Sequence, residues 1–388
     1  MKIVQSVSGK FHHFHLARQL HERGMLAKIF SSHPRQQLRG EAIPADLLQS
    51  FPLFHLLPIA YGRLGGRNRH VMDEMTYWDR LTFDQYVARN LPECDVLVAL
   101  SGSGLLSGQT ALSRGAKYLC DRGSSHIRYW NEILQDEFRR WGQQYELVDT
   151  RNISEEEEEY ALADLITVPS EFARRTFVEM GVPDRKVRVV SYGADLKRFS
   201  QVAQPSPDTF EILYVGAISF LKGIPDLLES FRRFKHPQKR LVLVGDVLPE
   251  MARYLQGISL DSVELRGRMP HAQLKEVMSR SHVLVFPSVN DGFGMVIGEA
   301  MACGCPVICS ENCGGADLFQ DGQEGYIVPI RNPVAITERL EQLAQDPNHR
   351  EQMSRYCLER IGKIGGWDTY GEEFVSVLSS VLSVPLSA

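Results

Sequence analysis

The chain has 388 residues, of which 43% are hydrophobic and 23% charged, and its formal net charge is −5. This length is too great for one ordinary core and favours two domains of average globular composition. The mild acidity excludes a global basic field for binding nucleic acid, and no stretch reaches the ~18 apolar residues that a membrane-spanning helix needs.

The start of the chain and its cysteines suggest a reducing compartment. Met1–Gln5 leads straight into a strand-like run and lacks the apolar core of a signal peptide. The seven cysteines form no disulfide-like framework, and those that cluster lack a paired C-x₂-C signature, so we expect small buried hydrophobes rather than a metal site. The clustered residues are Cys303, Cys305, Cys309 and Cys313. We therefore expect a cytoplasmic protein, either free or peripheral at the inner face of the membrane.

In the first half of the chain, short β-like runs alternate with helical stretches. A strand is expected at Ile3–Val7, followed by an amphipathic helix over Phe11–Arg23 that Gly24 ends. Further strands are expected at Leu26–Phe30, Asp95–Leu100, Lys117–Cys120, Leu165–Val168 and Val187–Val190. Such alternation favours a parallel, doubly wound sheet with ligands at the carboxyl ends of its strands.

Two charged clusters of the first half have structural interpretations. Adjacent histidines on a helix point in different directions, so we expect a mixture of exposed and cleft-facing rings rather than a metal site at His12, His13 and His15. Ser154 and Glu157 have the spacing of a capping box. The acidic run Glu155–Glu159 is therefore expected to be the solvated start of a helix.

The longest apolar run, Phe51–Tyr61, contains two prolines and a histidine, and Arg63, Arg67 and Arg69 follow it. Such a segment could contact an anionic membrane and a lipid acceptor. An irregular loop that covers the core of the first domain is the alternative interpretation.

A polar stretch with two prolines, residues 197–208, is the best candidate for an interdomain linker. After it the alternation restarts, which indicates domains at residues 1–196 and 209–365. The expected strands are Ile212–Val215, Leu241–Gly245, Val263–Leu265, Val283–Phe286, Pro306–Cys309 and Tyr326–Val328.

The most informative stretch of the chain is residues 287–308. Asp291 and Glu299, eight positions apart, bracket a Gly-Phe-Gly turn that opens a helix. Glycines let the backbone approach a ligand closely, and the free amides of a helix start favour phosphate. Asp291 would bind a sugar hydroxyl. Glu299 is more than a turn into the helix and would lie near a nucleoside. The intervening residues are donor-binding candidates: Gly292, Phe293, Gly294, Met295 and Val296.

A second motif, residues 214–228, is a strand that ends in a turn at Gly216, followed by a helix whose start carries Lys222. A cleft-facing lysine at this position would neutralise the charge that develops on a departing diphosphate. An exposed helix lysine is the alternative interpretation.

Together these motifs resemble the signature of glycosyltransferase family 4 (group 1), the retaining GT-B enzymes, whose pattern of Glu, seven residues and Glu starts with Glu-Gly-Phe-Gly. Here the first acid is Asp291, one methylene shorter. The resemblance continues through residues 313–317 and 321–328 and covers roughly residues 160–370. It implies an α/β fold with two Rossmann-like domains facing each other across a cleft, and a C-terminal helix within residues 366–388 that crosses back to the first domain.

The chain departs from the resembling enzymes at Ala217, where they usually have an arginine. This change removes a bidentate phosphate clamp that a lysine cannot mimic. Two explanations are open: another arginine substitutes for the clamp, or donor binding is weak. Arg266 and Arg268 are the nearest substitutes, and Arg268 is our donor-binding candidate.

In the first half the resemblance is less specific. Gly9 follows the first strand, where the family places a glycine-bearing loop near the diphosphate, although a plain turn is an equal alternative. His126 lies where the family often places a histidine beside the donor sugar, with Arg122 as a local alternative.

The resemblance implies a retaining transfer of a sugar from a nucleotide-sugar, a UDP- or GDP-sugar first of all, to an acceptor hydroxyl that the sequence does not identify. The catalytic candidates are Asp291, Lys222 and His126. No cofactor is expected, and no metal ion either, because the sequence has no Asp-x-Asp pair and because Lys222 and helix ends could replace a cation. A weakly active sugar-nucleotide-binding scaffold and a sugar-nucleotide epimerase or hydrolase are the alternatives.

Overall fold

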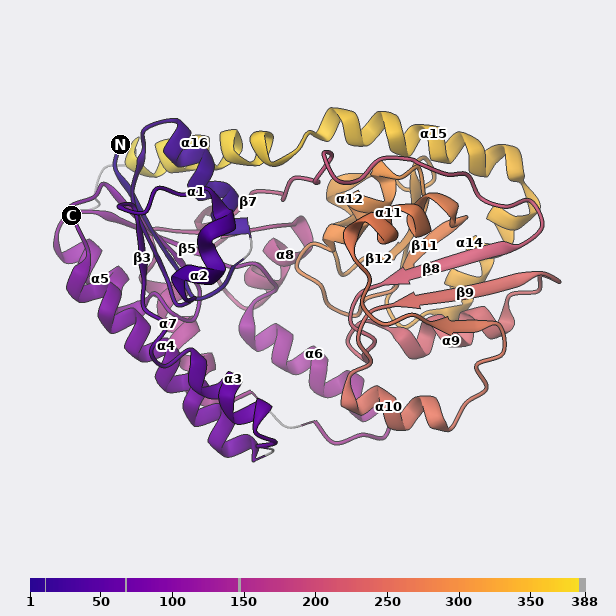
Figure 1. Ribbon diagram of the computed structural model, residues 1–388, viewed down its shortest axis with the longest axis horizontal. Coiled ribbons are helices and arrows are strands. Elements are labelled where there is room, and N and C mark those ends of the chain that lie inside the picture. Colours follow the sequence, from indigo (N-terminus) through magenta and orange to yellow (C-terminus); the bar gives the residue numbers. More distant parts are fainter. Residues whose placement is uncertain (11, 67, 146–147, 384–388) are drawn as a thin grey trace.

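The computed structural model describes residues 1–10, 12–66, 68–145 and 148–383. It contains two parallel sheets that stand side by side, each covered by helices (Figure 1). We call the parts of the chain around these sheets the first and the second domain. Phe11, Arg67 and residues 384–388, which figure in the predictions above, lie outside the described residues. No described helix has the length and apolarity needed to cross a membrane.

The first sheet has seven strands in the order β3-β2-β1-β4-β5-β6-β7, and neighbouring strands are parallel. Strands such as β6 are buried along their whole length and mostly apolar, as expected where helices cover both faces of a sheet. The strands are β1 (Ile3–Val7), β2 (Leu26–Ser31), β3 (Leu48–Ser50), β4 (Val96–Leu100), β5 (Lys117–Asp121), β6 (Leu165–Val168) and β7 (Val187–Val189). The helices are α1 (His12–Glu22), α2 (Arg35–Leu38), α3 (Leu56–Arg63), α4 (Arg69–Asn90), α5 (Leu105–Ser113), α6 (Ile127–Arg140), α7 (Thr150–Leu162) and α8 (Glu171–Glu179), with short 3₁₀ turns at Arg39–Glu41 and Asp184–Lys186.

The second sheet has six parallel strands in the order β10-β9-β8-β11-β12-β13. The strands are β8 (Phe210–Val215), β9 (Lys239–Val244), β10 (Val263–Leu265), β11 (Val283–Phe286), β12 (Val307–Ser310) and β13 (Gly325–Val328). The helices are α9 (Ile224–Arg233), α10 (Pro249–Gln256), α11 (His271–Arg280), α12 (Met295–Ala302), α13 (Gly315–Leu318), α14 (Pro333–Gln345), α15 (Pro347–Ile364) and α16 (Trp367–Ser383).

Each predicted strand is present, with ends within two residues of those expected, and the predicted burial of the four clustered cysteines is confirmed. Strand β3 was not predicted. It has only three residues, Leu48–Ser50, at the edge of the sheet, too few for either an alternating pattern or an apolar run.

The prediction of a solvated helix start at Glu155–Glu159 is wrong. Helix α7 begins at Thr150, where the Asp149 side chain accepts a hydrogen bond from the Arg151 amide at 2.9 Å. The acidic run therefore lies in the body of the helix, and the face that meets the sheet carries Glu156 and Glu159, both buried. Because the helix is capped at Asp149, five residues before the predicted cap at Ser154, these carboxylates lie beyond the first turn and on the side that faces the core.

The interpretation of residues 51–61 as an irregular loop over the core is also wrong. The segment leads into α3, and none of the residues of this helix is buried. Leu53 is 65% exposed and Leu64, just after the helix, 88%. Phe51 at the start of the segment packs against the core of the first domain, whereas Leu53, Leu56, Leu57 and Ile59 face outward.

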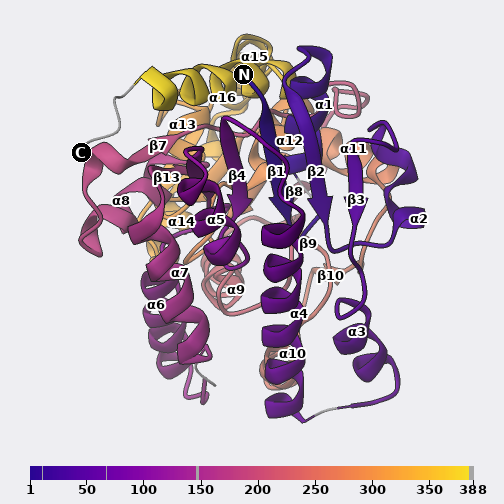
Figure 2. The same cartoon turned by 90° about the vertical axis from the view of Figure 1, so that its left-hand side faces the viewer.

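The last described helix returns to the first domain. Figures 1 and 2 show α16 lying along the side of the molecule that carries α1. The ring of His15 stacks on Trp367 at the start of α16, with ring centroids 3.9 Å apart. Just before α16, the backbone runs so close to Gly193 that a Cβ there would lie 2.3 Å from the carbonyl carbon of Gly366. The segment between the domains and the start of α16 are therefore packed backbone against backbone.

Ion pairs on α6 also hold the domains together. The guanidinium of Arg140 donates two hydrogen bonds of 2.7 Å to the carboxylate of Asp226 on α9. One turn earlier, the buried carboxylate of Glu137 accepts hydrogen bonds from Arg331 of the second domain and from the Trp141 indole, both at 2.7 Å. The Asp226 side chain is 2% exposed, so its charge depends on Arg140 for compensation.

We expect Arg140→Ala to destabilise the protein by ~1.5–3 kcal/mol, because a buried carboxylate loses a charged hydrogen-bond partner. Urea unfolding, followed by circular dichroism, measures the change. Arg139→Ala is the matched control, since Arg139 is a neighbour on the same helix whose ion pair with Asp136 is exposed. Equal effects of the two substitutions would show that the contact with Asp226 contributes nothing.

Candidate functional site

The loop between β11 and α12 carries Asp291 and is held by its own hydrogen bonds. The Asp291 amide donates to the Asn312 carbonyl, and the Asp291 carboxylate accepts from the Phe293 amide, both at 3.0 Å. Gly294, with φ of 78°, precedes the first residue of α12, a conformation that favours glycine. The loop thus presents one carboxylate at the start of a helix.

Lys222 meets this carboxylate from the turn before α9. Its ammonium pairs with Oδ2 of Asp291 and lies 5.8 Å from the centroid of the Phe286 ring. Both side chains are about one-fifth exposed, at 21% and 20%. The structure therefore brings together the two residues that the sequence assigned to a diphosphate and to a sugar. A ligand that binds either of them must exchange this ion pair for its own contacts.

Gly292 packs directly against the backbone of the first domain. A Cβ at Gly292 would lie 2.3 Å from the Gly123 carbonyl oxygen and 2.7 Å from Cα of Ser124. The Gly292 carbonyl also accepts a hydrogen bond of 2.6 Å from the Ser170 hydroxyl. Gly123 and Ser170 follow β5 and β6, so the Asp291 loop faces the carboxyl ends of the first sheet. Ligands of doubly wound sheets bind at this edge.

Glu299 faces a cavity that both domains line. The cavity has a volume of about 580 Å³, and its walls include Glu299 and Met295 of α12, Asp195 of the interdomain segment, and Lys10 and Arg18 of the first domain. Burial, and secondly the charge of Asp195, raises the pKa of Glu299 to about 7. Lys10 is next to Gly9, so the loop after β1 lies across the cavity from α12. A polar ligand of nucleoside size would fit here.

The arginines considered as replacements for the clamp missing at Ala217 have other partners. Arg266 pairs with Glu264 on β10, with Nε and Oε1 2.7 Å apart. The side chain of Arg268 is 83% exposed and pairs with Asp246 after β9. Gly216 lies at the turn after β8, where its amide donates to the Val244 carbonyl at 2.9 Å. In this arrangement neither arginine contacts the Lys222–Asp291 pair.

His126 lies inside the first domain. Its Nδ1 accepts a hydrogen bond of 3.2 Å from the Arg128 amide at the start of α6, and its ring packs 5.0 Å from both Tyr160 and Phe177. Burial lowers the pKa of the imidazole to about 4. Arg122, the local alternative, forms an ion pair with Glu156. The structure does not bring His126 together with the Asp291 loop.

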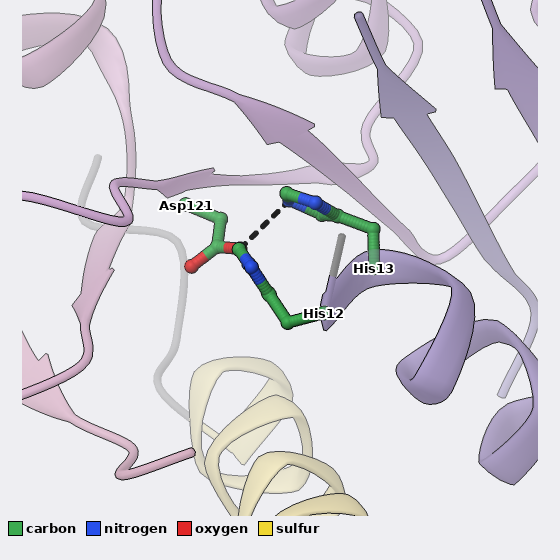
Figure 3. A group of neighbouring side chains, drawn as sticks. All are labelled: His12, His13 and Asp121. Atoms are coloured by element: carbon green, nitrogen blue, oxygen red, sulfur yellow. Dashed lines mark hydrogen bonds and ion pairs between the residues drawn. The ribbon is translucent and has the colours of Figure 1, made fainter. Parts of the chain in front are cut away.

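Three other side chains converge at the carboxyl end of β5 (Figure 3). Nε2 of His12 and Nε2 of His13 lie 2.7 and 2.9 Å from the same carboxylate oxygen of Asp121. The prediction that the adjacent histidines point in different directions is therefore wrong. Side chains in the first turn tilt toward the N-terminus of their helix, so both rings can reach one group beyond that end. His12 and His13 follow strand β1 in the chain, and Asp121 ends strand β5 of the same sheet. Their position after parallel strands of one sheet is the signal that could have predicted this cluster.

Residues 197–360 match the family model described as glycosyl transferases group 1. By sequence, these residues are similar to that family. The match includes Lys222, Asp291 and Glu299, and so both motifs of the second domain. The predicted resemblance to group 1 glycosyl transferases is thereby confirmed for this part of the chain.

Curated relatives agree with this assignment. The D-inositol 3-phosphate glycosyltransferase of Streptomyces bingchenggensis is 30% identical over 243 residues, which are 56% of this chain and 53% of the relative. The glycogen synthase of Mycobacterium tuberculosis is 27% identical over 192 residues, 47% of this chain and 46% of the relative. The chain spans about half the length of the curated relatives it matches.

Solved structures show that the whole described chain has the GT-B fold. The Anabaena protein HepE in complex with UDP has a TM-score of 0.71 at 16% identity, with 98% of this chain and 100% of HepE covered. Sucrose-phosphate synthase from Thermosynechococcus elongatus has a TM-score of 0.72 at 20% identity, with 99% and 100% covered. The predicted pair of Rossmann-like domains is confirmed.

The raised pKa of Glu299 predicts a pH-dependent stability. Its folded-state pKa of about 7 lies above the ordinary value of 4.5, so stability falls as the pH rises from about 4.5 to about 7. We expect Glu299→Gln to gain stability relative to the parent by ~1–3 kcal/mol between pH 5 and pH 8. Urea unfolding at both pH values measures this, with Glu338→Gln, an exposed position on α14, as the control. A difference independent of pH would show that Glu299 ionises normally.

Proposed function

We propose that this protein is a retaining glycosyltransferase of the hexosyltransferase type, which moves a sugar from a nucleotide-sugar donor to an acceptor hydroxyl. The observation that carries the proposal is the Lys222–Asp291 ion pair at the start of α12, in a segment with the sequence of group 1 glycosyl transferases. An ammonium there can meet a diphosphate, and the adjacent carboxylate can accept hydrogen bonds from sugar hydroxyls.

In the proposed reaction, the bond between sugar C1 and the diphosphate oxygen breaks, and its electron pair stays with the diphosphate. The acceptor oxygen bonds to C1 on the same face, and its proton passes to the departing diphosphate oxygen. Lys222 stabilises the charge that develops on the diphosphate, Asp291 orients the sugar, and Glu299 binds the ribose hydroxyls. The residues thus position the reactants and stabilise charge, and none of them acts as a nucleophile.

Backbone groups complete the proposed donor site. The amides of the first turn of α12, which starts after Gly294 and includes Met295 and Val296, favour the diphosphate, and the Phe293 amide holds the Asp291 carboxylate beside them. Gly292 lets this loop pack directly against the Gly123 backbone of the first domain, because it has no side chain, and we keep it as a donor contact through its backbone. We keep Gly9, Gly216 and Arg268 as donor contacts from their order in the sequence. With Lys222 and these amides offsetting the diphosphate charge, we propose a reaction that needs no metal ion or other cofactor.

The donor we favour is a UDP-sugar, with a GDP-sugar as the alternative. Solved structures of the similar Anabaena protein contain UDP and UDP-glucose. The cavity beside Glu299 has room for the nucleoside part of either donor. A thermal-shift screen of UDP-, GDP-, ADP- and dTDP-sugars discriminates among them, because a ligand at 100 times its dissociation constant adds ~2.7 kcal/mol of stability.

We also propose that the protein works in the cytoplasm and that α3 contacts the membrane that supplies a lipid acceptor. Leu53, Leu57 and Leu64 are exposed around this helix, and Arg63 and Arg69 stand next to them. Exposed apolar side chains beside arginines suit an anionic membrane surface. Cosedimentation with vesicles of anionic lipid should be lost when the three leucines are replaced by serine.

A second candidate function is a weakly active sugar-nucleotide-binding scaffold. It is favoured by Ala217 and by the other partners that the structure gives Arg266 and Arg268. Product analysis with radiolabelled donors separates the candidates. Transfer to an added acceptor supports the glycosyltransferase, free sugar alone indicates a hydrolase, and binding without turnover indicates the scaffold.

We expect Lys222→Ala to lower kcat at least tenfold while the donor dissociation constant changes less than threefold, because its charge matters most as the diphosphate departs. Steady-state kinetics and calorimetric binding of the donor measure the two quantities. Lys235→Ala, which removes an exposed lysine of the same domain, is the control. A higher KM with unchanged kcat would contradict this role.

Asp291 departs from the family pattern and so provides a separate test. Loss of a charged hydrogen-bond partner costs ~1.5–3 kcal/mol, so Asp291→Ala should lose about tenfold to a hundredfold in kcat/KM. Asp291→Glu should keep the fold and shift the preference among donors, because the longer side chain reaches a different hydroxyl. The measurement is kcat/KM of both variants across the donor panel. Transfer by Asp291→Ala at the parental rate would remove Asp291 from the sugar site.

A further inference from the structure

We propose that Asp121 and His12 of the first domain position the Asp291 loop of the second domain, through the stacked ring of Tyr192 and the ring of Phe293. The proposal makes His12, Asp121 and Tyr192 positioning residues for the site described above. It rests on the proposed function where it concerns turnover, and on the structure alone where it concerns the order of the loop.

The series of contacts from Asp121 to the Asp291 loop begins with the Asp121 carboxylate, both of whose oxygens have partners. Oδ1 of Asp121 accepts a hydrogen bond of 2.7 Å from the Thr167 hydroxyl on the neighbouring strand. Oδ2 lies 2.7 Å from Nε2 of His12. Burial, and secondly the neighbouring His13, lowers the pKa of His12 to about 4, so the imidazole is neutral at pH 7 and its Nε2–H donates to Asp121. The carboxylate therefore fixes both the tautomer and the direction of the His12 ring.

The second step links the His12 ring to the segment between the domains. Tyr192 lies between β7 and β8, and its ring stacks on His12 with centroids 4.5 Å apart and an interplanar angle of 28°. On its other sides the Tyr192 ring meets Tyr370 and Trp367 of α16, at 5.9 and 6.1 Å. Asp121 thus supports an aromatic cluster to which α1, α16 and the interdomain segment all contribute.

The third step reaches the loop that carries Asp291. The edge of the Phe293 ring meets Tyr192, with centroids 5.3 Å apart, and Phe293 is buried. Its amide is the group that donates to the Asp291 carboxylate, at 3.0 Å. Its carbonyl accepts from the Gly314 amide at 2.8 Å. A shift of the Phe293 ring therefore moves the amide that holds Asp291.

Two glycines at the contact between the domains bring the Asp291 loop close to His12 and Tyr192. A Cβ at Gly123 would lie 3.0 Å from the Tyr192 hydroxyl oxygen and 3.7 Å from Cε1 of His12. A Cβ at Gly292 would in turn lie 2.3 Å from the Gly123 carbonyl oxygen. The Asp291 loop therefore contacts a backbone that itself rests on His12 and Tyr192. Packed interiors transmit such displacements because they leave no slack.

A metal ion is the competing explanation for the His12, His13 and Asp121 cluster. Its donor atoms are near enough to share an ion. Nε2 of His12, however, makes a hydrogen bond of 2.7 Å to the carboxylate oxygen, and Nε2 of His13 lies 2.9 Å from the same atom, whereas ligands bound at ~2.0–2.2 Å to a tetrahedral zinc ion stand farther apart. Neither ring nitrogen of His13 has a hydrogen-bond partner among the described residues, although a metal-bound histidine almost always donates its second N–H. The geometry favours the hydrogen-bonded pair.

The first experiment follows the loop itself and needs no substrate. Hydrogen exchange of the full-length protein, read by mass spectrometry over peptides that contain residues 289–296, should speed up at least tenfold in His12→Ala and in Tyr192→Leu. Phe374→Leu is the matched control, because this buried aromatic residue of α16 is in contact with Tyr370 but is not among the aromatic neighbours of Phe293. Unchanged exchange in both variants, or an equal change in the control, overturns the proposal.

The second experiment is a double-mutant cycle on turnover. His12→Ala should lower kcat about tenfold with less than threefold change in donor KM, and Asp121→Asn, which keeps an acceptor for the His12 N–H, should retain more activity than Asp121→Ala. If His12 acts through Asp291, then His12→Ala should cost less than twofold in the Asp291→Ala background. Additive effects overturn the proposal.

Failure of the proposed function would be seen separately, as a parent protein without transferase activity but with the expected exchange behaviour. Elemental analysis of the purified protein addresses the remaining explanation. Stoichiometric zinc that is lost in Asp121→Ala would overturn the hydrogen-bonded pair in favour of a metal site, whereas metal-free protein supports the pair.

Discussion

The arrangement of this molecule depends on one contact, in which the backbone at Gly292 touches the backbone at Gly123 with no space for a side chain between them. Both glycines belong to loops that follow central strands, so the contact brings the carboxyl ends of the two sheets to the same place. The Lys222–Asp291 pair belongs to the second domain, whereas the Ser170 hydroxyl that binds the neighbouring Gly292 carbonyl belongs to the first.

Two kinds of interaction stabilise the contact between the two domains. Ion pairs lie at its periphery, and packed aromatic rings lie at its centre. The carboxylates of Glu137 on α6 and Asp226 on α9 are each buried against an arginine of the opposite domain, an arrangement that fixes a relative position because an unpaired buried charge is costly. In the segment between the domains, Tyr192 packs against rings from three other segments. Separating the two domains would expose both kinds of contact to water, so their relative position has two independent sources of stability.

The sequence was informative where the relevant residues are contiguous. Strand runs such as Leu165–Val168 and the order of Asp291, Gly294 and Glu299 could be read directly, because period, turn chemistry and helix start are local properties. His12 and Asp121 are separated by 109 positions, and no local pattern says that the start of α1 meets the end of β5. The predicted exposure of Glu159 was wrong for a related reason. Its carboxylate accepts hydrogen bonds from the amides of Gly102 and Gly104, which are distant in the sequence and which the acidic run does not reveal.

The return of α16 to α1 has a consequence for the order of events during synthesis. A ribosome makes the first sheet early, yet the helix that lies along α1 emerges only after the whole second domain (Figure 1). Until then, the α1 surface that His15 shares with Trp367 is uncovered on the nascent chain. Domains generally fold as units as they emerge, but this first domain has to wait for the last described helix before its surface is complete. Chains that terminate early would therefore display an apolar face on a domain whose own sequence is intact, which is the kind of surface that chaperones and proteases recognise.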